Sequence, residues 1–133
     1  MQILTYIDSG VLIAAARGDT EVSEQAIALL DDPDRTFAAS IWVRLEVLPK
    51  AIYHQQTDES EFYQAFFESV SIWAEPSSTL LDHALELACQ FGLGAIDALH
   101  IAAALAVDAT AIATAENVNK PIHRTGLIAT IKV

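Results

Sequence analysis

The stretch LTYIDSGVLI (residues 4–13) decides the fold. Its first half has the apolar and β-branched composition of a buried strand, which we expect to span residues 3–7. Asp8 follows that strand, and Ser9 opens a second apolar run with helical spacing that should end near Gly18. Open α/β sheets bind ligands outside the carboxyl ends of their strands. Asp8 is therefore a candidate functional residue if other acids reach the same edge of the sheet.

The rest of the chain continues this alternation of strands and helices. Further strands are expected at residues 36–39, 70–74, 109–113 and, at an edge of the sheet, 127–131. Helices are expected at residues 20–30, 41–54, 57–69, 77–91 and 95–107. Asp19 and Ser40 are expected to cap two of these helices, and Pro49 is expected to kink or break one.

This order of elements predicts the fold class. Strands that alternate with helices favour a three-layer α/β/α sandwich around a mainly parallel sheet of four to five strands. The composition is even from end to end, without a linker or an internal repeat. We therefore expect one domain over residues 1–133.

The composition also narrows the class of protein. A hydrophobic content of 53% over 133 residues excludes intrinsic disorder and allows a core without disulfides. The single Cys89 excludes a disulfide framework and a cysteine-based zinc site. The N-terminus does not resemble a signal peptide, and the longest apolar run, residues 98–107, is too short to span a bilayer. We expect a cytoplasmic protein that does not enter the membrane.

The formal net charge is −11, from 18 acidic and 7 basic residues. A protein that binds nucleic acid mainly through its phosphates is usually basic, so this charge argues against tight non-specific binding. Acids gathered in one cleft can nevertheless hold divalent cations, which reverse the local field. The charge therefore leaves metal-dependent phosphodiester chemistry open.

Most of the acids suit ordinary surface positions. Asp31, Asp32 and Asp34 suit a turn. The acids that suit solvated helix faces or first helical turns are Glu21, Glu24, Asp58, Glu59, Glu61, Glu68, Asp82 and Glu86.

Four acids lie instead in apolar surroundings or at the ends of expected strands: Asp8, Glu46, Asp97 and Glu116. Each has a local explanation, since Asp8, Asp97 or Glu116 would suit a helix start and Glu46 would suit an ion pair with a neighbouring cation. Because strand ends and helix starts share one edge of a parallel sheet, all four can converge there. Crowded carboxylates repel one another, so such a cluster implies bound cations, and oxygen ligands favour Mg²⁺ or Mn²⁺ over zinc.

In its motifs the chain resembles the PIN-domain family, and in particular the small single-domain toxins of the VapC type. The resemblance covers essentially the whole chain and rests on the order and spacing of four segments. These are YIDSGVLI (residues 6–13), RLEV (44–47), AIDALHIA (95–102) and ATAE (113–116). The family implies an α/β/α sandwich and metal-dependent endoribonuclease activity at a cluster of acids.

By position, Asp8, Glu46 and Asp97 match the three most characteristic acids of the family. Glu116 matches a fourth place, which is usually Asp in a Thr-x-Asp pattern, and its longer arm could reach a metal directly or through water. The resemblance thus implies that water activated by one or two Mg²⁺ or Mn²⁺ ions hydrolyses an RNA phosphodiester bond. Asp8 and Asp97 would be direct ligands, with Glu46 as a ligand or as a residue that positions the water.

Other polar residues receive supporting roles. Ser9 and Thr114 fall at hydroxyl positions that resemble those from which the family orients a carboxylate or a bound water. His100, three residues after Asp97, could contact substrate or a carboxylate, but a packed histidine with local hydrogen bonds is the favoured interpretation. Four cations flank the acids in the sequence: Arg44, Lys50, Lys120 and Arg124. They could contact RNA phosphates, although surface solubility explains them equally well.

The resemblance also implies partners: a second copy of the chain, and a small antitoxin whose tail enters the active cleft. The aromatic residues between positions 52 and 70 exceed what one helix face can easily bury, which is consistent with such an interface. An alternative is a non-catalytic PIN-like module that binds RNA or protein. The set of Asp8, Glu46 and Asp97 favours catalysis, whereas Glu116 and the negative charge leave the alternative open.

Overall fold

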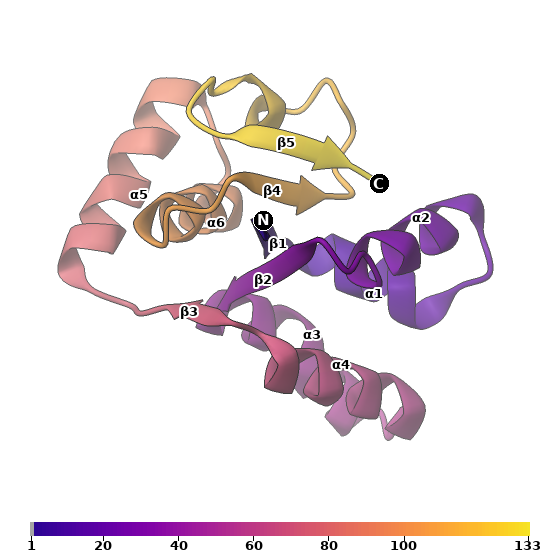
Figure 1. Cartoon of the computed structure of the whole chain (residues 1–133). Coiled ribbons are helices and arrows are strands. Elements are labelled where there is room, and N and C mark those ends of the chain that lie inside the picture. The colour runs from indigo at the N-terminus through magenta and orange to yellow at the C-terminus, as the bar shows by residue number, and fades with distance from the viewer. Residues whose placement is uncertain (1) are drawn as a thin grey trace.

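The computed structural model of the chain describes residues 2–133, and at its centre is a five-stranded sheet. The strands are β1 (Ile3–Ile7), β2 (Arg35–Ser40), β3 (Ile72–Ala74), β4 (Ala111–Thr114) and β5 (Ala129–Lys132). They lie in the order β3-β2-β1-β4-β5, and each neighbouring pair is parallel (Figure 1). The predicted α/β/α sandwich with a parallel sheet is confirmed, and β5 lies at an edge as expected.

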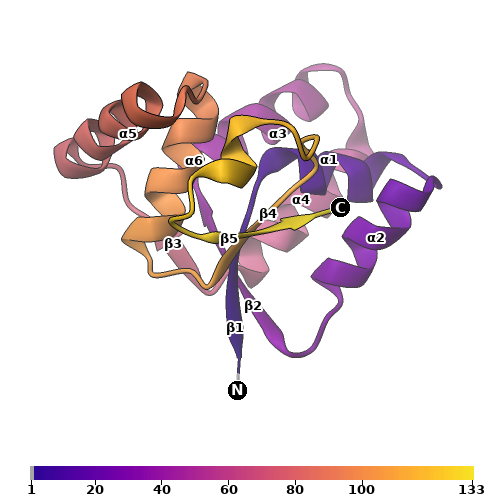
Figure 2. The ribbon, with the colours of Figure 1, turned by 90° about the horizontal axis from the view of Figure 1, so that it is seen from above.

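Helices cover the sheet on both faces. They are α1 (Ser9–Arg17), α2 (Glu21–Leu30), α3 (Ile41–Tyr53), α4 (Thr57–Ser69), α5 (Ser78–Phe91) and α6 (Ala95–Ala106), with a short 3₁₀ helix η1 (Pro121–Arg124). In two views at right angles, α5 and α6 lie to one side of the sheet and α1 and α2 to the other (Figures 1 and 2). Within residues 2–133, no helix combines the length and the apolar character needed to cross a membrane.

The path of the chain creates a switch point in the sheet. From β1 the chain moves outward to β2 and β3 through α1 to α4, and it then returns past β1 to β4 through α5 and α6. Right-handed crossovers in opposite directions place the two groups of helices on opposite faces. The direction reverses between β1 and β4, which is where doubly wound sheets bind their ligands.

The core explains why the middle strands are so apolar. Each residue of β4 is buried, as are the last three residues of β1, because helices cover both faces of the sheet. The small side chains Ala102, Ala103 and Ala104 are buried on α6 and let this helix pack closely on the sheet. The start of α6, which carries Asp97, is thereby held near the ends of the central strands.

Two predicted helix caps differ in detail from the structure. Helix α2 is capped by Thr20, whose Oγ1 accepts a hydrogen bond from the backbone N–H of Ser23, so the prediction of Asp19 as the cap is wrong. Ser40 does occupy the N-cap position of α3, but its side chain makes no capping bond there. Its hydroxyl is instead hydrogen-bonded to the Tyr6 hydroxyl.

Of the kink or break expected at Pro49, the break does not occur, because α3 continues through this residue to Tyr53. Proline lacks the N–H that would bond the carbonyl four residues earlier. Here that carbonyl belongs to Leu45, which is exposed, and water can satisfy the group. The 3₁₀ helix at residues 121–124 was not predicted from the sequence.

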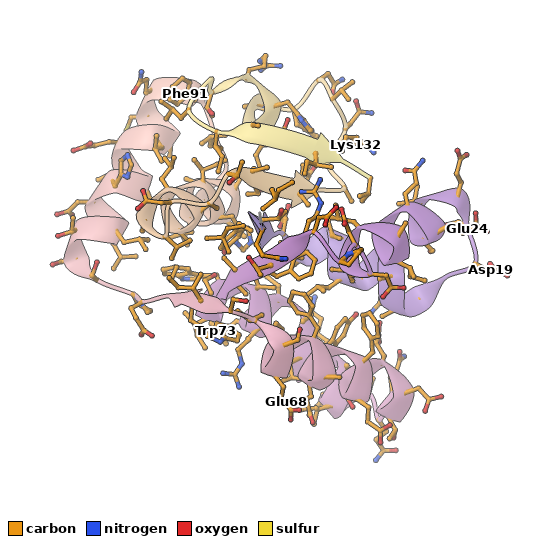
Figure 3. All side chains as sticks on the ribbon, viewed as in Figure 1. Asp19, Glu24, Glu68, Trp73, Phe91 and Lys132 are labelled. Atoms are coloured by element: carbon orange, nitrogen blue, oxygen red, sulfur yellow. The ribbon has the colours of Figure 1, made fainter. Side chains whose placement is uncertain are left out.

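The surface acids follow the expected distribution with one exception. Glu24 and Glu68 are exposed on the outer surfaces of α2 and α4 (Figure 3). Glu59 is only 7% exposed, so its assignment to a solvated helix turn is wrong. Its Oε1 accepts hydrogen bonds from Arg17 Nε at 2.5 Å and from the Tyr63 hydroxyl at 2.8 Å, and the bond from Arg17 ties α4 to α1.

Candidate metal centre

A cleft of about 340 Å³ lies where β1 and β4 end. Its lining includes the four acids that the sequence singled out: Asp8, Glu46, Asp97 and Glu116. They come from the end of β1, from α3, from the first turn of α6 and from the loop after β4. Ser9, Gly10, Ile13, Ile96 and Ala115 complete the lining. Acids from four separate parts of the chain therefore share one cleft at the switch point.

Asp8 is held by hydrogen bonds at both carboxylate oxygens. Its Oδ1 accepts from the backbone N–H of Ser9 at 2.7 Å, which caps α1, and its Oδ2 accepts from the Thr114 hydroxyl at 2.9 Å. The Ser9 hydroxyl is 3.4 Å from Oδ1, a long contact, so Ser9 holds Asp8 mainly through its backbone. The helix cap and the position in the acid cluster are thus compatible roles of one side chain.

Glycine at position 10 permits this close approach of α1 to the end of β4. A Cβ atom on Gly10 would lie 3.2 Å from the Cβ of Ala115, which is tighter than normal van der Waals contact. The backbone of α1 can therefore begin directly beside the loop that carries Glu116.

Glu46 is bonded to a histidine. His100 Nε2 lies 2.7 Å from Glu46 Oε1 and 3.4 Å from Asp8 Oδ1. Burial alone would raise the pKa of Glu46, but the hydrogen bonds from His100 and Ser9 and the nearby Lys50 ammonium outweigh it and hold this pKa below its ordinary value. Glu46 is therefore ionised at neutral pH.

The pKa of Asp97 is shifted in the opposite direction, above its ordinary value. Burial raises the pKa of Asp97, and the negative charges of Asp8, Glu116 and Glu46 raise it further, while His100 partly opposes them. The four carboxylates are thus close enough to repel one another. Without a cation, this cleft concentrates like charge.

The donor set fits a hard divalent cation. Four carboxylates supply only oxygen ligands, which suit Mg²⁺ or Mn²⁺, and a bound cation would relieve the repulsion that Asp97 senses. Within residues 2–133, three side chains form a compact group that could hold a metal ion: Asp8, Glu46 and His100. One ligand atom from each lies within 4.8 Å of the others. Asp97 and Glu116 line the same cleft outside this compact group.

The four predicted RNA-contacting cations are not gathered at the cleft. The Arg44 guanidinium lies over aromatic rings of α4 and β3, 5.8 and 5.6 Å from their centroids, and does not line the cleft. Lys50 is close enough to lower the pKa of Glu46. Lys120 immediately precedes η1, and Arg124 ends it, where its guanidinium donates to the carbonyl of Asn119.

Sequence reasoning missed the hydrogen-bond chain behind the acids. His100 is fully buried as expected, but its bonds are not local: Nδ1 lies 2.8 Å from the hydroxyl of Tyr6, which is 94 positions away. The Tyr6 oxygen lies in turn 2.6 Å from Ser40 Oγ. The available signals were the polar residues themselves, with Tyr6 two positions before Asp8 and His100 three after Asp97.

Comparison with known proteins identifies the family. A family model described as the PIN domain matches residues 5–120. The chain therefore belongs to the PIN-domain family, and the resemblance found in the sequence is confirmed. No curated protein matches the chain in a search of such proteins.

Solved structures share the fold over nearly the whole chain. One is VapBC2 from Rickettsia felis bound to a DNA fragment from its promoter, with a TM-score of 0.72 and 15% identity, covering 98% of this chain and 99% of the other. A second is VapBC-1 from nontypeable Haemophilus influenzae, with a TM-score of 0.67 and 17% identity, covering 98% of each chain. At these identities the likeness establishes the fold alone.

Proposed function

We propose that this PIN-domain protein is a Mg²⁺- or Mn²⁺-dependent endoribonuclease of the VapC toxin type, which hydrolyses RNA phosphodiester bonds. The observation that carries the proposal is the meeting of four carboxylates from four parts of the chain in one cleft at the switch point. Independent helix caps or surface ion pairs would have no reason to share that cleft. Membership of the PIN-domain family supports the same activity.

The roles of the acids follow from their surroundings. A Mg²⁺ or Mn²⁺ ion in the cleft would supply a Lewis acid that activates water and neutralises charge on the phosphate. Asp8 is the most rigidly oriented acid and, with Asp97, would be a direct ligand. Glu46, ionised and bonded to His100, would bind the ion or position the attacking water. Glu116 would complete the site directly or through water.

Substrate binding would depend on few cations. Lys50, one helical turn after Glu46, is the best placed of them to meet an RNA phosphate beside the acids. Lys120 immediately precedes η1 and Arg124 ends it, after the loop that carries Glu116. These two cations would contact RNA phosphates farther from the acids. Arg44 has the weakest support, because its guanidinium is stacked on aromatic rings away from the cleft.

The partners proposed for the chain are a small antitoxin and a second copy of the chain. Two solved structures that share its fold are VapBC structures, which supports a VapB-like partner. Exposed apolar side chains on α5, Leu81 at 48% and Leu85 at 66%, support a protein contact on that helix.

Cleavage of a labelled RNA by the purified protein tests the proposal. We expect Mn²⁺-dependent cleavage by the wild type, its removal by EDTA, and a loss of at least about 100-fold in Asp97→Asn, because a lost ligand removes the activating ion. Asp82→Asn, the same change at an exposed position of α5, serves as the matched control. Wild-type cleavage rates in a folded Asp97→Asn protein would refute the assignment. Metal binding without cleavage of any RNA would favour a binding module.

A further inference from the structure

His100 is fully buried in α6, yet both nitrogens of its ring have polar partners. Nδ1 lies 2.8 Å from the Tyr6 hydroxyl, and Nε2 lies 2.7 Å from Glu46 Oε1. The three residues come from β1, α3 and α6, so the ring joins three elements directly behind the acid cluster. A histidine that only filled the core would not need polar partners on two other elements.

The partners determine which nitrogen carries the proton. An ionised Glu46 can only accept hydrogen bonds, so Nε2 must donate to it, since a bare nitrogen 2.7 Å from a carboxylate oxygen would be repelled. In the neutral ring Nδ1 then accepts from the Tyr6 hydroxyl, and the Tyr6 oxygen accepts from Ser40, 2.6 Å away. Donation therefore runs in one direction, from Ser40 to Tyr6 to His100 to Glu46.

This direction of donation gives His100 a different role from the carboxylates beside it, which can bind a metal ion. Its Nε2 is close enough to the oxygens of Asp8 and Glu46 to be counted in one metal-binding group with them. A nitrogen that carries a proton, however, has no free lone pair for a metal ion. The ring therefore serves the carboxylates and not the ion.

We propose that His100 is a positioning residue of the metal centre, which holds the Glu46 carboxylate in its place in the cleft through Nε2–H while Tyr6 and Ser40 fix the ring. The inference rests on the proposed function, because Glu46 needs this orientation only if it serves a metal or the water beside it. Outer partners that orient carboxylate ligands typically contribute about 10- to 100-fold to metal affinity.

Calorimetric titration of the full chain with Mn²⁺ tests this role. We expect His100→Leu to weaken Mn²⁺ binding by about 10- to 100-fold. His100→Gln, whose side-chain amide can donate where Nε2 does, should recover most of that loss. His83→Leu is the matched control, the same change on α5 away from the cleft, and should bind as the wild type does.

The outcomes separate the two proposals. A wild type that binds no Mn²⁺ would overturn the metal centre and this inference with it. Wild-type affinity in a folded His100→Leu protein, or an equal loss in His83→Leu, would overturn the inference alone. Equal losses in His100→Gln and His100→Leu would also count against it, because the donated hydrogen bond would then contribute nothing.

Nitrogen NMR of the ¹⁵N-histidine-labelled wild type provides a readout that needs neither catalysis nor a variant that folds. We expect a His100 spectrum with a protonated Nε2 and a bare Nδ1, unchanged in tautomer when Mg²⁺ is added. A bare Nε2, or an Nε2 that loses its proton when Mg²⁺ binds, would show that His100 is a ligand and would overturn the inference.

Discussion

Two carboxylates that line the same cleft have pKa values shifted in opposite directions. Glu46 is held ionised by its hydrogen bonds, whereas burial and the charges of Asp8 and Glu116 favour the protonated form of Asp97. The difference arises from partners: within residues 2–133 no side-chain hydrogen bond compensates the burial of Asp97, whereas the Glu46 carboxylate is bonded to His100. Ionisation of Asp97 is therefore disfavoured in the metal-free protein.

This cost gives a prediction for stability against pH. Because the pKa of Asp97 is raised on folding, the folded chain holds a proton that the unfolded chain has released, and stability falls as pH rises through that window. With EDTA at pH 7.5, Asp97→Asn should therefore raise Tm by about 2–5 °C, which corresponds to about 1 kcal/mol in a domain of this size. Thermal melting monitored by circular dichroism measures it, and the gain should shrink as pH falls towards 4. A lower Tm in the variant would contradict the assignment.

Among the helices, α1 and α4 are joined by a buried acid that the sequence did not reveal. Burial would raise the pKa of Glu59, but the hydrogen bonds from Arg17 and Tyr63 outweigh it and lower this pKa. The second oxygen, Oε2, is buried and has no hydrogen-bond partner within residues 2–133. The carboxylate therefore depends on the few donors that reach its other oxygen.

Replacing Arg17, the exposed partner of Glu59, tests how far the carboxylate depends on its donors. Arg17→Met should destabilise the protein by about 1–2 kcal/mol at pH 7 in urea unfolding, because it leaves a buried carboxylate with fewer donors. Adding Glu59→Gln should recover part of the loss, since the buried charge then disappears. The loss should also diminish at acid pH, as Glu59 becomes protonated. Arg124→Met, at an exposed position, is the control, and an equal effect there would rule out a specific role for the Arg17–Glu59 pair.

Elements with strong local signals were predicted well, and details set by tertiary contacts were not. The strand at residues 3–7 and the helix at 57–69 have their predicted bounds, because periodicity and composition are local properties. The burial of Glu59 depends on Arg17, 42 positions earlier in the chain. The periodicity of the sequence does not indicate that Arg17 and Glu59 are paired.

The candidate site divides in the same way. The meeting of four acids could be anticipated from their places after strands and at helix starts, because a parallel sheet brings those places to one edge. The chain from Ser40 through Tyr6 to His100 spans 34 and 94 positions and follows no local rule. The aromatic side chains between residues 52 and 70 are largely buried in the structure, although Tyr53 at the end of α3 is 82% exposed.

For the whole molecule, the net charge of −11 makes a bound cation more valuable than its ligands alone would suggest. Mn²⁺ at 100 times its dissociation constant should stabilise the wild type by about 2.7 kcal/mol. Asp8→Asn should abolish that gain while keeping α1 capped, because asparagine caps helices as well as aspartate does. Thermal melts with Mn²⁺ measure both, with Asp82→Asn as the control. An equal gain in Asp8→Asn would point to non-specific screening of the surface charge.

The reversal of the chain between β1 and β4 has a consequence during synthesis. Asp8 leaves the ribosome well before Thr114, which orients it and lies 106 positions later in the chain. Until β4 pairs with β1, the carboxylates of the cleft have no common edge on which to meet. A nascent chain therefore cannot assemble the centre early, and any activity that the cleft confers begins only when translation of the domain is almost complete.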